Sequence, residues 1–171
     1  MLLDLINLAK LRRAVVYALF LALLFLVQNL LGAYVAPLGV HAMFIPAAVV
    51  CVALFEGGVW GAMFGLVAGY FADMGFAENS VLFTLLFSVI GYFTGVLGKY
   101  TLRKALVTAL VLSAGALLLA AFCQMFPFLF FKDTRIWPVL KTGLLQVLWS
   151  LPFIFVIYYP CRAIAGHEMT E

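Results

Sequence analysis

The chain has 171 residues, of which 67% are hydrophobic and only 10% are charged, and its formal net charge is +3. A soluble domain of this length would have too little polar surface to cover its apolar area, so the composition excludes a soluble fold and predicts an integral membrane protein. In such a protein a small basic excess concerns orientation in the lipid bilayer, and no nucleic-acid partner is expected.

Six apolar segments follow one another and predict a single all-α transmembrane domain over residues 1–171. A transmembrane helix needs about 20 apolar residues, although short spans also occur. The segment APLG at 36–39 separates the first two spans, Asn79 and Ser80 are capping residues for the fourth, and Pro127 is expected to end or kink the fifth. The expected spans are residues 14–34, 40–55, 57–73, 80–98, 105–126 and 142–160.

The basic residues predict how this domain is oriented. Six spans place both termini on the same side of the membrane, and lysine and arginine favour the cytoplasmic side. With the N-terminus inside, the inner face holds Lys10, Arg12, Arg13, Lys99, Arg103, Lys104 and Arg162, and the outer face holds Lys132, Arg135 and Lys141. The sequence therefore predicts a cytoplasmic N-terminus and a cytoplasmic C-terminus.

The third segment, EGGVWGAMFGLVAGYFAD at 56–73, sorts its residues onto two faces of a helix. At 100° per residue, its glycines, its alanines and Asp73 fall within about 160° of arc, and every bulky residue falls on the opposite side. Glycine costs about 1 kcal/mol relative to alanine in a helix, so a whole face of it needs a reason. Close contact between helix backbones in lipid is such a reason. The candidate contact residues are Gly58, Gly61, Gly65, Gly69 and Asp73.

The fourth segment carries a second face of small residues, within about 80° of arc, that includes Ser88, Gly91 and Gly95. Two arrangements explain the two faces. The third and fourth spans pack against each other inside one chain, or one small-residue face receives a helix from another protein or from a second copy of this chain, which would make a homodimer.

Alanine recurs every four residues on the first span, at Ala14, Ala18 and Ala22. This small-xxx-small pattern is typical of ordinary helix packing, and it also suits docking to an external transmembrane partner.

Few residues could carry chemistry. Asp73 lies at the end of the third span, where a carboxylate meets either a packing partner or the headgroup region. Glu56 lies where the third span begins and would complement the dipole of that helix. Neither carboxylate is accompanied by the spacing of a catalytic or metal-binding motif, and the cysteines are isolated, so we expect neither an enzyme nor a cofactor nor a metal site. The cysteines are Cys51, Cys123 and Cys161.

These features together resemble a known family. A proline lies in the short second span (Pro46), the third span ends as GAMFGLVAGYFAD (61–73), IGYFTG follows at 90–95, and the last span contains LWSLPFIF (148–155). This pattern resembles the MreD family, the small polytopic subunits of the bacterial rod-shape and cell-elongation machinery. The residues that carry the resemblance most specifically are Gly61, Gly65, Gly69, Asp73, Gly91, Tyr92 and Gly95.

The resemblance implies a non-enzymatic scaffold in the bacterial inner (cytoplasmic) membrane. Its expected partners are an MreC-like single-span protein and, indirectly, MreB filaments and the peptidoglycan synthase complex. The implied fold is similar to the six-helix bundle of the S components of energy-coupling-factor transporters.

That similarity also supplies the alternative function, the vitamin-binding S component itself. In S components an alanine series on the first span docks the transmembrane coupling subunit, a role that Ala14, Ala18 and Ala22 would suit. A vitamin site needs several convergent polar groups, and the spans offer few. They are Gln28, Asn29, Gln124 and Gln146.

Overall fold

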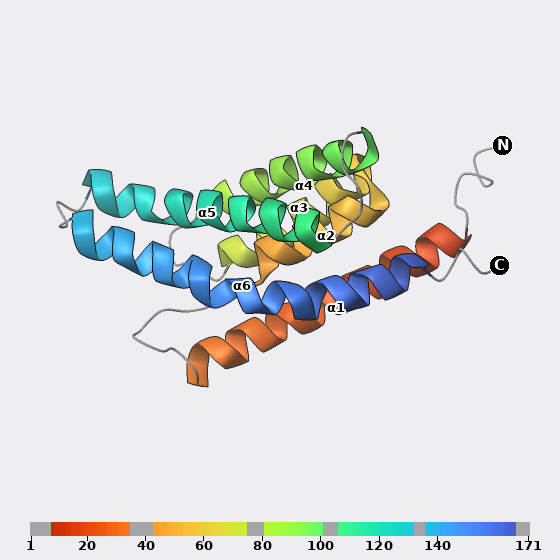
Figure 1. The fold of residues 1–171 in the computed structure, drawn as a ribbon, viewed down its shortest axis with the longest axis horizontal. Helices are drawn as coiled ribbons and strands as arrows, with labels where there is room; N and C mark the ends of the chain where they lie inside the picture. The colour runs from red at the N-terminus through yellow and green to blue at the C-terminus, as the bar shows by residue number, and fades with distance from the viewer. Residues whose placement is uncertain (1–7, 35–42, 75–80, 101–105, 132–135, 167–171) are drawn as a thin grey trace.

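The computed structural model describes residues 8–34, 43–74, 81–100, 106–131 and 136–166, and the regular elements among them are all helices. The helices run back and forth along an elongated bundle, so that α1 begins at the end where α6 finishes (Figure 1). They are α1 (Leu8–Tyr34), α2 (Ile45–Glu56), α3 (Gly58–Met74), α4 (Leu82–Tyr100), α5 (Leu106–Phe131) and α6 (Ile136–Gly166). The expected all-α architecture is confirmed for these residues.

Four of the helices are long and apolar enough to cross a membrane. Their candidate spans are Arg12–Leu30, Leu82–Lys99, Leu106–Phe126 and Leu140–Gly166. The helix α3 has 17 residues and α2 has 12. At 1.5 Å per residue, α2 covers about 18 Å of a hydrocarbon core about 30 Å thick. Among the described residues four helices are therefore candidates to span a membrane, and the expected six spans are not confirmed.

Several helix ends differ from the expected ones. The helix α5 continues through Pro127 to Phe131, so of the two expected effects of this proline, a helix end or a kink, the helix end is wrong. The helix α6 begins at Ile136, inside the stretch expected to be a polar connection, and it contains Pro152 and Pro160. In α1 the helix starts at Leu8, ahead of the basic residues. The expected capping residues Asn79 and Ser80 lie outside the described residues.

The short helix α2 forms the centre of the bundle. Every residue from Ile45 to Leu54 is buried, and all five other helices pack around it. Its sequence, IPAAVVCVALFE, carries no polar side chain before its last residue. A helix that is apolar on all sides is stable only when it is surrounded, and small alanine and valine side chains let the neighbours approach it closely.

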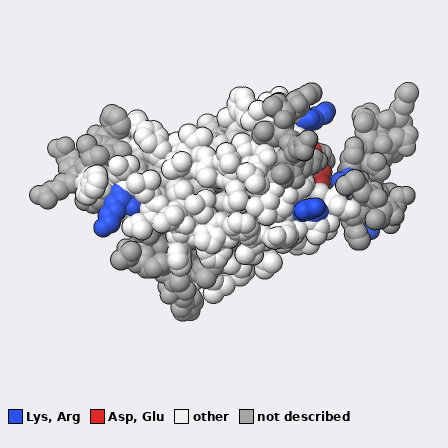
Figure 2. All heavy atoms as spheres, viewed as in Figure 1, with Lys and Arg blue, Asp and Glu red and all other residues white. Residues whose placement is uncertain are grey.

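The described basic side chains are unequally divided between the two ends of the bundle. Arg12, Arg13, Lys99 and Arg162 lie near the start of α1 or the ends of α4 and α6, which share one end of the bundle (Figure 1), and Lys141 lies near the start of α6 at the opposite end. Figure 2 shows basic side chains at both ends. Between the two ends, the visible surface is free of charge among the side chains that are described. Such a neutral band flanked by charged ends matches a protein that crosses a bilayer.

Candidate functional site

The glycine faces of α3 and α4 meet each other. A Cβ atom added to Gly65 would overlap the carbonyl oxygen of Phe87 and lie 3.0 Å from the Cα of Ser88, and one added to Gly69 would lie 2.5 Å from the Cα of Thr84. The two backbones are thus in direct contact, which the glycines of α3 allow because they have no side chain. We call this contact the α3–α4 seam; its residues are Gly58, Gly61, Gly65 and Gly69 of α3 and Ser88, Gly91 and Gly95 of α4.

The wide small-residue face of α3 has a second neighbour in α2. A Cβ atom on Gly61 would lie 2.6 Å from the carbonyl oxygen of Gly91 in α4 and 2.5 Å from the Cβ of Ala53 in α2. At the start of α3, a Cβ on Gly95 would lie 2.5 Å from the Cα of Gly58. Of the two arrangements left open by the sequence, the structure has the one inside a single chain, and both neighbours of this face come from the chain itself.

Asp73 connects the end of α3 to the beginning of α4. Its two carboxylate oxygens accept the backbone N–H of Phe83 at 3.0 Å and that of Thr84 at 2.9 Å, and the Thr84 hydroxyl donates to the same carboxylate at 2.6 Å. The first N–H groups of a helix have no partner within the helix, and the positive end of its dipole favours an anion. Asp73 therefore acts as the N-cap of α4, although it belongs to the preceding helix.

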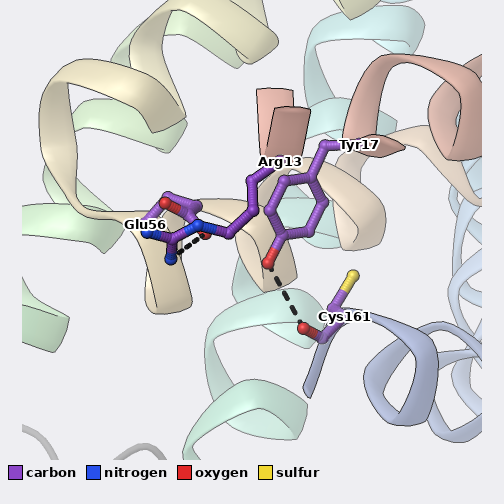
Figure 3. A network of polar contacts seen from close by, with 4 residues as sticks. All are labelled: Arg13, Tyr17, Glu56 and Cys161. Carbon is purple, nitrogen blue, oxygen red and sulfur yellow. Dashed lines mark hydrogen bonds and ion pairs between the residues drawn. The ribbon is translucent and has the colours of Figure 1, made fainter. Parts of the chain in front are cut away.

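A polar cluster joins α1, α2 and α6 at the end of the bundle where α1 begins (Figure 3). The Arg13 guanidinium lies 3.5 Å from the Glu56 carboxylate, and the two side chains are 23% and 14% exposed. The Tyr17 hydroxyl, which is completely buried, donates to the backbone carbonyl of Cys161 at 3.3 Å. The cluster of Arg13, Tyr17, Glu56 and Cys161 thereby connects α1 to two neighbouring helices.

Glu56 lies between two helices. It is the last residue of α2, whose dipole does not favour a carboxylate there, and it lies two residues before the start of α3, the helix whose dipole it was expected to complement. Gly57 follows with a φ of 96°, a conformation that favours glycine, and turns the chain directly into α3. The partner that compensates the Glu56 charge is Arg13, 43 residues away in the sequence.

At its other end α2 is capped by side chains from two helices. The side-chain oxygen Oε1 of Gln28, on α1, accepts the backbone N–H of Phe44 at 2.7 Å and that of Ile45 at 3.3 Å. The Ser150 hydroxyl, on α6, accepts the N–H of Met43 at 3.0 Å and donates to the Gln146 carbonyl at 2.7 Å. Polar side chains thus satisfy a helix end that the apolar bundle surrounds.

The remaining amide side chains also bond within the protein. The Gln146 amide donates to the Gln124 side-chain oxygen at 3.4 Å, which links α6 to α5, and the Asn29 amide donates to the Phe25 carbonyl of its own helix at 3.0 Å. Of the four amide residues that the sequence offered for a ligand, three bond other segments of the bundle, and the fourth, Asn29, is exposed and bonds within α1.

The alanine series of α1 faces two environments. Ala14 packs against the core, whereas Ala18 and Ala22 are exposed and line an apolar cavity between α1, α2 and α3. The cavity has a volume of about 260 Å³. The structure thus places the three alanines along one side of α1, with the cavity next to Ala18 and Ala22.

The sequence reasoning missed Arg13, Tyr17, Glu56, Gln28 and Ser150 as contact residues. One signal was available, because Arg13 and Glu56 bound a stretch of 42 residues, 14–55, without any lysine, arginine, aspartate or glutamate. Two spans between two charges place both charges on the same side of the membrane, where they can pair. No comparable signal identifies Gln28 or Ser150 as caps of α2.

Among the described residues no group of three histidine, cysteine or carboxylate side chains is placed to hold a metal ion, and Cys51, Cys123 and Cys161 are free thiols. Comparisons with protein-family models, with curated proteins and with solved structures give no match to this chain. What the described polar side chains form is a set of contacts that join helices or cap their ends, set among a large apolar core.

Proposed function

We propose that this protein is a six-span scaffold subunit of the bacterial cell-elongation machinery, located in the inner membrane, which binds an MreC-like single-span protein. Through that partner it would help to position MreB filaments and the peptidoglycan synthase complex. The proposal rests on the sequence pattern that runs from Pro46 through the glycines and Asp73 of the third segment to the LWSLPFIF segment at 148–155.

One structural observation supports a scaffold more than any other. The polar side chains within the bundle join its helices to each other, as Gln28 and Ser150 do at α2, Asp73 at α4 and Gln124 with Gln146 between α5 and α6. A binding site or a catalytic site needs polar groups that converge on a ligand. A chain that uses its polar groups for its own assembly is suited to present an outer surface to other membrane proteins.

The orientation belongs to the same proposal. The end of the bundle with Arg12, Arg13, Lys99 and Arg162 would face the cytoplasm by the positive-inside rule, which places the first and last helix ends there as well. In this proposal α2 and α3 are the two crossings that the four long helices do not account for.

The alternative function is a vitamin-binding S component, docked through Ala14, Ala18 and Ala22. The observation that favours it is the cavity beneath Ala18 and Ala22. The residues lining this cavity are all apolar, and the four amide side chains bond elsewhere, so a polar vitamin would find no hydrogen-bonding groups there. The scaffold is therefore the function that the geometry supports better.

Co-purification from the native membrane in mild detergent separates the two functions. A scaffold is expected to co-purify with a single-span membrane protein in a fixed ratio. An S component is expected to co-purify with an ATPase-linked membrane subunit and a bound vitamin. Recovery of the second set without a single-span partner would overturn the proposal. Cysteine labelling at residue 102 tests the orientation, because a label accepted only from outside would reverse it.

A further inference from the structure

The helices α1 and α3 contact each other through aromatic side chains at two levels. The space between these two levels is only partly filled. Tyr17 of α1 meets Phe64 of α3 edge-on, with ring centroids 6.0 Å apart, and Phe25 of α1 meets Phe71 of α3 at 5.7 Å. Eight residues of α1 separate the two levels, which corresponds to about 12 Å along the helix. Between the two pairs lies the cavity of about 260 Å³, which we call the α1–α3 window.

The window opens sideways from the bundle. Ala18 and Ala22 on one rim and Val67 on the other are exposed, whereas Ala48, at the back of the window on α2, is completely buried. The window lies on the part of α1 that belongs to a candidate membrane span, Arg12–Leu30. When α1 crosses the bilayer over this span, the window faces the hydrocarbon chains of the lipid.

The chemistry and the size of the window restrict its occupant. Every lining residue is alanine, leucine, isoleucine, valine or phenylalanine, so water and polar ligands would find no hydrogen-bonding partners there. An apolar cavity of about 150 Å³ is enough to bind benzene in a soluble protein. A transmembrane helix about 10 Å across needs on the order of 1,200 Å³ for each 15 Å of its length, which far exceeds the window. A flexible methylene chain fits where a helix does not.

A path leads to the window along the outer surface of α1. A shallow hollow formed by Ala22, Phe25, Leu26, Asn29 and Leu30 shares its first two residues with the window. Its far end carries the exposed amide of Asn29, the one polar side chain of the hollow, at the end of α1 opposite to Arg13. An apolar track that ends in a polar group at the edge of a span matches the order of chain and ester groups in a phospholipid.

We propose that the α1–α3 window is a binding site for one acyl chain of a bilayer phospholipid, which lies along the hollow of α1 with its ester groups at the level of Asn29. The chain fills the space between the two aromatic pairs and buries apolar surface that Ala18 and Ala22 leave open. This site goes beyond the scaffold function and does not depend on it.

Native mass spectrometry of the protein released from membranes into mild detergent tests the site. The wild type is expected to retain one phospholipid more than the variant Ala18→Phe, whose ring would fill the window. The matched control is Leu19→Phe, because Leu19 is 66% exposed and does not line the window. It is expected to retain phospholipid as the wild type does. Equal phospholipid retention by all three proteins would overturn the proposal.

Two further measurements keep the test decisive if Ala18→Phe does not fold. The variant Ala22→Phe fills the same window from the next turn of α1 and is expected to show the same loss. In the wild type, a phospholipid with a photoreactive group at the end of its acyl chain should label 18–25 and 64–71 more strongly than the exposed Val107 and Val111 of α5. Uniform labelling would overturn the proposal, as would loss of a co-purifying membrane protein from Ala18→Phe with phospholipid retention unchanged.

Discussion

The two sides of α3 show two ways of packing apolar helices. On one side α3 meets α4 through the α3–α4 seam, where glycine backbones touch and no space remains. On the other side it faces α1 through large side chains, Tyr17 with Phe64 and Phe25 with Phe71, and a cavity of about 260 Å³ remains between them. In a bilayer hydrophobicity does not drive helices together, because lipid is as apolar as leucine. How closely each neighbour approaches α3 therefore depends on the size of the side chains at the contact.

The difference extends to what holds each helix in place. The position of α4 follows from close backbone contact along its whole length, with Asp73 at its beginning. The helix α1 has polar contacts near both ends, Arg13 with Glu56 at one and Gln28 with the N-terminus of α2 at the other. Small residues thus give α3 and α4 a continuous backbone contact. The polar contacts of α1 hold it at separate positions, and the cavity lies between them.

The largest effect is expected at the α3–α4 seam. Gly65→Leu places a side chain where the Phe87 carbonyl and the Ser88 backbone already lie, so α3 and α4 must separate and we expect the folded protein to be lost. The control is Gly115→Leu on α5, because a Cβ atom at Gly115 meets nothing within 4 Å. Yield of monodisperse protein and circular dichroism in detergent measure the difference. Normal assembly of Gly65→Leu would show that the seam is not needed.

The Arg13–Glu56 contact should give the next largest effect. Arg13→Leu removes the cationic partner of a carboxylate that is 14% exposed, and we expect a loss of about 2–3 kcal/mol in the free energy of unfolding. Arg12→Leu changes the adjacent, exposed arginine and should cost less than about 0.5 kcal/mol. Unfolding by SDS in mixed micelles measures both. Equal effects would mean that α1 is not held through Glu56.

A smaller loss is expected at Asp73. Asp73→Ala removes the acceptor of two backbone N–H groups at the start of α4 and should cost about 1–2 kcal/mol. Asp73→Asn keeps one oxygen acceptor, so its cost should be lower, and both should be far milder than Gly65→Leu. If instead Asp73→Asn abolished the partner binding proposed above while the stability stayed near that of the wild type, Asp73 would have a role beyond capping.

The smallest of the four effects is expected at Gln28. Gln28→Leu leaves the N–H groups of Phe44 and Ile45 without their side-chain acceptor, at a cost of about 1 kcal/mol. Asn29→Leu alters the neighbouring amide, which bonds only its own helix among the contacts described, and should change stability little. The same SDS unfolding assay compares them. A larger loss from Asn29→Leu would remove Gln28 as the contact that positions this part of α1.

The sequence by itself determined the helical membrane character and the two faces of α3. Both are written locally, in the apolar composition and in glycines that recur with the period of a helix, so no knowledge of distant residues is needed to recognise them. The same local patterns predicted six helical segments, and the structure places a helix over each of them. They did not predict that α2 would be only 12 residues long and lie at the centre of the bundle.

Only the tertiary structure decided which groups meet. Arg13 and Glu56 are 43 residues apart, and Met43 and Ser150 are 107 residues apart. Each contact depends on how far a helix is rotated and shifted against its neighbours, and a local pattern does not contain these quantities. For the same reason the sequence showed that Ala18 and Ala22 are small without showing what lies beside them. The aromatic pairs of α1 and α3 set the spacing of the two helices. At this spacing the small side chains of Ala18 and Ala22 do not reach α3, and the window between the helices stays open.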